Sequence, residues 1–167
     1  MSIYNLNQLQ CFSKDFRSWC HTFKFKGLVI NRQPKISFFL KLNHITLKKI
    51  VDFLVDTGTT YSAITEKEAT IMNIDVSSLP YFKREAVGFG GLFRNKMINR
   101  LVVLTFKSNE DEHQIKCGSF IVTCIPPNIL AEDREKMIRY TPNVLGMDIL
   151  HNFRTCVEKN QVELALL

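Results

Sequence analysis

The chain has 167 residues, of which 46% are hydrophobic and 23% charged, which excludes an intrinsically disordered polypeptide and is enough for one domain with a substantial core. No stretch approaches the roughly 20 consecutive apolar residues of a membrane span, and the polar residues 1–10 are unlike a signal peptide, so we expect a cytoplasmic protein without membrane contact. The net charge is +6 at neutral pH, and the excess is confined to residues 1–49, which hold nine lysines and arginines against one acidic residue.

The early part of the chain predicts β-strands. Residues 23–30 and 36–42 are short runs rich in Phe, Ile and Val, and the turn-forming segment 31–34 separates them. Residues 50–55 form another apolar run, and we expect this strand to be buried on both faces. The run leads into Asp56-Thr57-Gly58, where the glycine permits a sharp reversal of the backbone.

A helix and a glycine-rich hairpin follow these strands. Residues 61–64 favour a strand, and the capping box Thr65-Glu-Lys-Glu68 predicts a short helix. Residues 84–89 and 96–106 flank the segment Gly88-Phe89-Gly90-Gly91, and this arrangement predicts a hairpin with a mobile tip.

The last third of the chain predicts a similar mixture of elements. Residues 114–125 favour strands as far as the break at Pro126-Pro127, and residues 129–140, charged on one side, predict a surface helix. The remaining predicted elements are a strand at 143–146, a short helix at 147–153, and closing strands at 155–158 and 161–167. Together these elements predict a mainly β fold with two or three short helices.

Three segments of the chain together resemble a known family. In this order, Phe53-Leu-Val-Asp-Thr-Gly-Thr59, Val87-Gly-Phe-Gly-Gly91 and Val144-Leu-Gly-Met-Asp-Ile-Leu150 are similar to the catalytic strand, the flap and the closing helix of retropepsin-like aspartic proteases. The last segment resembles cellular and bacterial members more than retroviral ones. The resemblance covers roughly residues 36–167 and implies a closed, barrel-like acid-protease domain that forms a homodimer.

The resemblance also implies a role for individual residues. Asp56 would be catalytic, and because peptide hydrolysis of this kind takes two facing carboxylates, a chain with one Asp-Thr-Gly must obtain the second from an identical subunit. The turn would be supported by Thr57, Gly58 and Thr59, and the flap over a peptide or protein substrate would consist of Gly88, Phe89, Gly90 and Gly91. Gly146 would leave room behind the catalytic turn, and Asp148 would be a structural carboxylate at the start of the closing helix. No metal or organic cofactor is implied.

Two positions depart from the retroviral pattern. Retroviral members commonly have Asp two residues after the catalytic glycine and Arg directly after the later glycine, and the two side chains pair. This chain has Thr60 and Met147 at these positions. We therefore expect the dimer to be braced in another way.

Two other functions stay open at the level of the sequence. Asp56-Thr-Gly-Thr-Thr-Tyr-Ser62 also resembles the phosphate-binding motif D-x-G-T-T-x-S of actin-like and Hsp70-like ATPases, whose second lobe and further motifs have no counterpart in this chain. A retropepsin-like dimer can also serve as a binding or assembly module without catalysis.

The N-terminal part of the chain exceeds what a retropepsin-like core needs. We expect residues 1–30 to form a basic extension or an extra strand, with a regulatory or self-cleaved role, and residues 31–167 to form the protease domain. The basic residues 1–49 suit nucleic acid or an acidic partner, although a solvated polar face accounts for the same charge. The five cysteines and four histidines lack the spacing of a zinc site, so we assign no metal.

Overall fold

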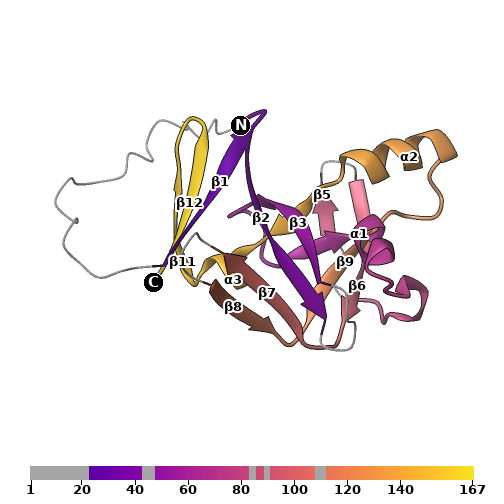
Figure 1. Ribbon diagram of the computed structural model, residues 1–167. Helices are drawn as coiled ribbons and strands as arrows, with labels where there is room; N and C mark the ends of the chain where they lie inside the picture. Colours follow the sequence, from indigo (N-terminus) through magenta and orange to yellow (C-terminus); the bar gives the residue numbers. More distant parts are fainter. Residues whose placement is uncertain (1–22, 43–47, 83–85, 89–90, 108–111) are drawn as a thin grey trace, which may run out of the picture.

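The computed structural model describes residues 23–42, 48–82, 86–88, 91–107 and 112–167. The strands are β1 (Lys24–Ile30), β2 (Gln33–Leu42), β3 (Lys48–Val55), β4 (Ala63–Thr65), β5 (Ala86–Gly88), β6 (Gly91–Ile98), β7 (Val102–Lys107), β8 (Glu112–Cys117), β9 (Phe120–Cys124), β10 (Asn143–Leu145), β11 (Phe153–Val157) and β12 (Gln161–Leu166). The helices are α1 (Glu66–Ile71), the 3₁₀ turn η2 (Val76–Ser78), α2 (Ala131–Tyr140) and α3 (Met147–Leu150). The prediction of a mainly β fold with short helices is therefore confirmed (Figure 1).

The sheet is open rather than closed. Within the described ranges its strands follow the order β11-β12-β1-β2-β3-β10-β4-β9-β6-β5, and β7 and β8 branch off at β2. The branch arises because one edge of β2 has two partners: residues 33–35 pair with β1, whereas residues 39–42 pair with β7. The strands β1, β12 and β11 thus extend to one side of the molecule, and β7 and β8 to another (Figure 1).

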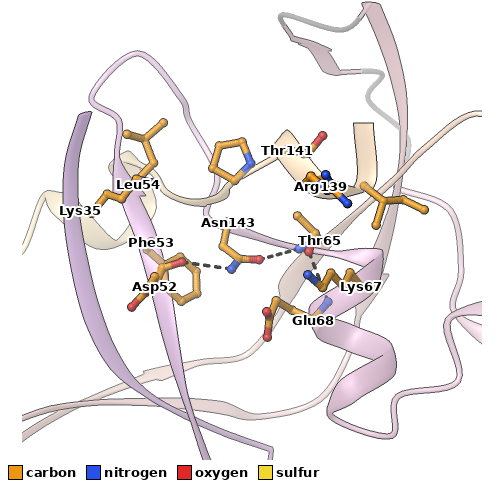
Figure 2. A pocket seen from close by; sticks show the side chains of 12 residues that line it. Lys35, Asp52, Phe53, Leu54, Thr65, Lys67, Glu68, Arg139, Thr141 and Asn143 are labelled. Carbon is orange, nitrogen blue, oxygen red and sulfur yellow. Dashed lines mark hydrogen bonds between the residues drawn. The ribbon is translucent and has the colours of Figure 1, made fainter. Parts of the chain in front are cut away.

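Strand β10 lies between β3 and β4, although it is far from both in the sequence. It pairs in parallel with β3 and in antiparallel orientation with β4. The buried side chain of Asn143 holds this arrangement, because its Nδ2 donates to the Asp52 carbonyl at 3.1 Å and its Oδ1 accepts from the Thr65 amide at 2.8 Å. These bonds border a polar hollow of about 180 Å³ between β3, α1 and the end of α2 (Figure 2).

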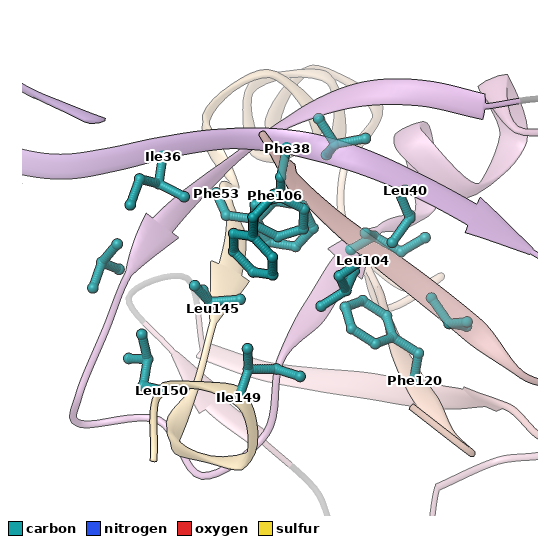
Figure 3. Close-up of a cluster of buried hydrophobic side chains, with 14 of the residues drawn as sticks. Ile36, Phe38, Leu40, Phe53, Leu104, Phe106, Phe120, Leu145, Ile149 and Leu150 are labelled. Carbon is teal, nitrogen blue, oxygen red and sulfur yellow. The ribbon is translucent and has the colours of Figure 1, made fainter. Parts of the chain in front are cut away.

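The core is built around a group of phenylalanine rings. Phe38 and Phe53 stack with ring centroids 4.3 Å apart, and Phe106 lies 4.7 Å from Phe38 (Figure 3). These rings come from β2, β3 and β7, and all are buried. Burial of such side chains is the main favourable contribution to folding.

Strand β3 has one buried face and one exposed face. Val51, Phe53 and Val55 point into the core, whereas Ile50 is 57% exposed and Asp52 is exposed. The prediction that residues 50–55 are buried on both faces is therefore wrong. Strand alternation explains the difference: successive side chains point to opposite faces, and at Lys48, Ile50 and Asp52 the outer face of β3 is exposed.

The helices follow the predicted signals closely. Thr65 is the N-cap of α1, and its hydroxyl accepts a hydrogen bond from the Glu68 amide at 3.3 Å, which confirms the capping box. Helix α2 begins at Ala131, two residues after the predicted start, and Arg134 joins it to Glu66 of α1 by an ion pair of 3.3 Å. Among the described residues, the helices are too short or too polar to cross a membrane.

The glycine-rich hairpin is present, but the strand predicted to follow it is divided. Gly88 pairs with Gly91 across β5 and β6, so the predicted hairpin is confirmed, and its tip at residues 89–90 lies outside the described residues. The predicted strand 96–106 is two strands, because β6 ends at Ile98 and β7 begins at Val102. The predicted division of the chain at residue 30 stays a prediction. Strand β1, which ends there, pairs with both β2 and β12.

Replacing Phe53 by alanine tests the core. Loss of this fully buried ring should lower the free energy of unfolding by about 3 to 5 kcal/mol, because both the transfer free energy and the packing of the ring stack are lost. The matched control is Ile50→Ala on the exposed face of the same strand, for which we expect less than about 1 kcal/mol. Urea denaturation followed by circular dichroism measures both changes, and equal losses would contradict the assignment of the two faces.

Candidate active site

Asp56 directly follows β3 and is fixed there by β10. Its amide donates a hydrogen bond to the carbonyl of Leu145 at 3.1 Å, which continues the pairing of the two parallel strands by one residue. The backbone of Asp56, the candidate catalytic residue, is therefore held by the central strands of the sheet at the point where its turn begins. Its position depends on β10 as much as on its own strand.

The turn itself orients the carboxylate of Asp56. The amide of Gly58 donates to Oδ1 at 2.9 Å, and the hydroxyl of Thr59 donates to Oδ2 at 2.8 Å. The amide of Thr59 also donates to the Asp56 carbonyl at 3.3 Å. Each carboxylate oxygen thus has a donor from the same turn, and Asp56 is half-buried. The neighbouring Thr57 is exposed.

Gly58 lies close to the carboxylate of Asp56, in the turn that the sequence predicts. Its φ lies outside the left-handed region. A Cβ atom at this position would lie 3.1 Å from Oδ1 of Asp56. The absence of a side chain lets the Gly58 amide approach the carboxylate.

Gly146 lies directly against the segment that follows the Asp56 turn. A Cβ atom on Gly146 would lie 2.7 Å from the carbonyl carbon of Tyr61 and 2.9 Å from the carbonyl oxygen of Thr59. Both contacts are shorter than van der Waals packing allows, and both are with backbone atoms that cannot rotate away. The chain therefore passes behind the turn at a distance that only glycine permits.

A second network joins this crossing point to α3. Oδ1 of Asp148 accepts hydrogen bonds from the amide of Ser62 at 2.8 Å and from its hydroxyl at 2.6 Å. The Ser62 hydroxyl in turn accepts from the Gly146 amide at 2.8 Å, and Ser62 is only 1% exposed. Sequence reasoning placed Asp148 at the start of the closing helix but did not assign Ser62 to the site. No local pattern reveals this pair, because the partners are 86 residues apart.

Thr60 and Met147, the two positions that depart from the retroviral pattern, form hydrogen bonds through their backbone atoms. The amide of Met147 donates to the Thr59 carbonyl at 2.8 Å, and that of Asp148 donates to the Thr60 carbonyl at 3.0 Å. The side chains of Thr60 and Met147 remain exposed, and Met147 is 41% accessible. Within the subunit, the main chain therefore joins the two segments at these positions.

The base of the glycine-rich hairpin contacts the segment that follows the Asp56 turn. Phe82 packs edge-on against Tyr61, with ring centroids 5.2 Å apart, and its amide donates to the Asn95 carbonyl of β6 at 2.8 Å. The strands β5 and β6 bring Gly88 and Gly91 together at the tip of the hairpin. Phe89 and Gly90, which were also predicted to belong to the flap, lie outside the described residues.

The geometry of the turn differs from a phosphate-binding hairpin. The strands on either side of it, β3 and β4, are not paired with each other, because β10 lies between them and pairs with both. The amide of Gly58 and the hydroxyl of Thr59 are already bonded to Asp56. Among the residues described, no three His, Cys, Asp or Glu side chains are grouped closely enough to hold a metal ion.

Comparison with known proteins identifies the fold. No protein-family profile matches the sequence, and no curated protein does. A retropepsin-like aspartic protease from Rickettsia conorii superposes with a TM-score of 0.50 and 19% identity, covering 84% of this chain and 98% of that protein. The protease of EIAV in complex with the inhibitor HBY-793 matches with a TM-score of 0.38 and 18% identity, covering 73% of this chain and 90% of that protein. The chain has a retropepsin-like fold.

Replacing Gly146 by alanine tests the crossing point behind the turn. The added methyl group would collide with the backbone of residues 59 and 61, so we expect a loss of about 1 to 3 kcal/mol in the free energy of unfolding. Gly118→Ala is the matched control, because nothing lies within 4 Å of a Cβ at that position. Thermal or urea unfolding measures the free energy of unfolding of both variants. If Gly146→Ala is as stable as Gly118→Ala, the contact is not as close as described.

Proposed function

We propose that this protein is an aspartic endopeptidase that acts as a homodimer, with one Asp56 contributed by each subunit. The observation that supports this most directly is the carboxylate of Asp56. The Gly58 amide and the Thr59 hydroxyl hold it at the end of a central strand, within a retropepsin-like fold. A half-buried carboxylate whose orientation is fixed by its own turn is suited to acid–base chemistry.

The proposed reaction needs both copies of Asp56. Two carboxylates that face each other cannot both be ionised at low cost, so they share one proton. The ionised carboxylate accepts a proton from a water molecule as that water attacks the scissile carbonyl carbon, and the protonated one donates its proton to the carbonyl oxygen. The tetrahedral intermediate then collapses, the C–N bond breaks, and the amine leaves with a proton returned from the dyad. Activity should therefore favour mildly acidic pH.

The remaining predicted residues have supporting roles in this proposal. Thr57, exposed in the isolated subunit, would face the partner turn and brace the dyad. The hairpin of β5 and β6 would close over a bound peptide, with backbone amides near Gly88 and Gly91 as donors. Gly146 packs against the backbone that follows the turn, and Asp148 binds Ser62; both contacts would hold the turn in place.

The other two functions find less support. The strands β3 and β4 pair with β10 and not with each other, and the Gly58 amide and the Thr59 hydroxyl already donate to Asp56. Both observations count against a phosphate-binding turn. A non-catalytic dimer has no need of a carboxylate at the turn, where burial and like charge make it costly. An assay for ATP hydrolysis and an assay for binding of pepstatin separate the three functions, because only a protease active site of this kind should retain pepstatin.

Asp56→Asn is the primary test of the proposed activity. The amide cannot accept a proton from water, so cleavage of a peptide library should fall to background, whereas the turn keeps its shape because an amide oxygen can still accept from Gly58 or Thr59. Sedimentation equilibrium of wild type and variant should show the same dimer. Unchanged peptide cleavage in the variant would contradict the proposal.

Thr59→Val tests the hydrogen bond to the carboxylate. Removal of the hydroxyl takes away the donor to Oδ2, so one of the two contacts that orient the carboxylate is lost. We expect kcat/KM to fall by roughly fivefold, as for a bond that contributes about 1 kcal/mol. Thr59→Ser keeps the hydroxyl and serves as the control. Equal kcat/KM values for Thr59→Val and wild type would show that this bond does not orient the dyad.

A further inference from the structure

The outer face of the sheet carries a group of lysines across four neighbouring strands. The strands β3, β2, β7 and β8 lie side by side (Figure 1). On the face opposite the core the lysines and Ile50 are exposed, Phe39 and Val103 are half-buried, and Thr105 is buried. On that face, Lys48 lies opposite Lys41, Lys41 opposite Val103, and Val103 opposite Lys116. We call this region the lysine face; it comprises Phe39, Lys41, Lys48, Ile50, Val103, Lys107 and Lys116.

The charges of the lysine face are not balanced by the residues around them. Lys41 and Lys48 occupy directly opposed positions on paired strands, an arrangement that destabilises a sheet. Within the described part of the chain, Lys41, Lys48 and Lys116 have no ion-pair partner, although all three are exposed. The protein thus retains a repulsive cluster of positive charge that its own described acids do not neutralise.

The acids that do lie nearby are already engaged. Glu112 is 3.1 Å from Lys107, and a hydrogen bond from Gln114, followed by the charges of Lys107 and Lys48, lowers the pKa of this carboxyl group. Asp52 accepts a hydrogen bond from the Ser37 hydroxyl at 2.5 Å. Lys41 and Lys116, which form no ion pair with a described acid, lie in one row with Lys48, whose charge acts on Glu112 from beyond ion-pair distance.

Apolar side chains occupy the middle of the lysine face. Ile50 is 57% exposed and lies opposite Phe39 on the neighbouring strand. The Nζ atoms of Lys48 and Lys107 lie 4.5 Å and 5.5 Å from the centroid of the Phe39 ring. A partner would thus meet an apolar centre bordered by ammonium groups.

We propose that the lysine face docks an acidic segment of a protein partner, in which carboxylates alternate with apolar side chains. Charge complementarity favours a polyanion, and the exposed Ile50 favours one that also has apolar groups to bury. Single-stranded nucleic acid fits less well, because two lysine ammonium groups already occupy positions over the Phe39 ring, on which a base would have to stack.

The lysine face is separate from the candidate active site. Lys48 begins β3 and Asp56 follows its end, so the two lie roughly 26 Å apart along an extended strand. A segment bound at the lysine face therefore leaves the catalytic turn accessible. The proposal stands whether or not the protein is a protease.

Binding of labelled peptides to variants of the full chain tests the proposal. The probe is a fluorescein-labelled synthetic peptide in which glutamate alternates with leucine and valine, measured by fluorescence anisotropy at low and at physiological salt. The double variant Lys41→Gln/Lys48→Gln should weaken binding by about fivefold or more, since each exposed charge contact contributes roughly 0.5 kcal/mol. Ile50→Ser should weaken it as well. The matched control Lys24→Gln/Lys26→Gln removes two exposed lysines of β1 and should leave affinity within about twofold, as expected for charges outside the contact.

Two further probes complete the experiment. The same peptide with glutamine in place of glutamate should not bind detectably, and labelled oligodeoxythymidine should bind more weakly than the acidic peptide. The proposal is overturned if the acidic peptide does not bind, if both double variants weaken binding equally, or if the oligonucleotide binds more tightly than the peptide. Circular dichroism of each variant confirms folding, and removal of the opposed charges should leave stability unchanged or raised.

Discussion

The insertion of β10 between β3 and β4 is the constraint on which the rest of the site depends. It places the Leu145 carbonyl where the Asp56 amide can reach it, and it brings Gly146 against the backbone of Tyr61. Asn143 at the start of β10 bonds to both neighbouring strands through its side chain. Because a strand of three residues makes few ladder bonds, these additional contacts are what fix its register. An error of one residue in that register would place a residue with a side chain where Gly146 now contacts the backbone of Thr59 and Tyr61.

The turn at Asp56 is supported by polar contacts on one side and by the aromatic core on the other. Phe53, three residues before Asp56, stacks on Phe38 in the centre of the sheet. Ser62, six residues after Asp56, is buried and bonded to both Gly146 and Asp148. The carboxylate therefore lies between two segments that cannot move independently of the fold. Such rigidity holds a reactive group in one geometry before any substrate or partner subunit arrives.

Local features of the fold were predictable from residue patterns, whereas the long-range contact of Gly146 behind the turn was expected only through the family resemblance, and other long-range bonds were not expected. The cap at Thr65 and the hairpin that joins Gly88 to Gly91 depend on residues a few positions apart, and both were predicted. The bond between Ser62 and Asp148 joins residues far apart in the chain, and no periodicity encodes it. The exposure of Ile50 was missed for a related reason: an apolar run does not show which of its faces lacks a covering layer. The close approach of Gly58 to the Asp56 carboxylate could be found only from the structure, because the sequence indicates only that glycine favours a turn.

Strand β3 connects the candidate active site to the lysine face, and its packing limits how the two can influence each other. The residues Val51, Phe53 and Val55 lie in the core, while Lys48, Ile50 and Asp52 face outward. The strand is paired with β2 along one edge and with β10 along the other, so a partner at Lys48 cannot displace Asp56 without breaking core contacts. Docking at the lysine face would therefore change where a partner is held rather than the geometry of the carboxylate. A bound acidic segment would act by raising the local concentration of the protein to which it is attached, near an Asp56 turn that keeps its shape.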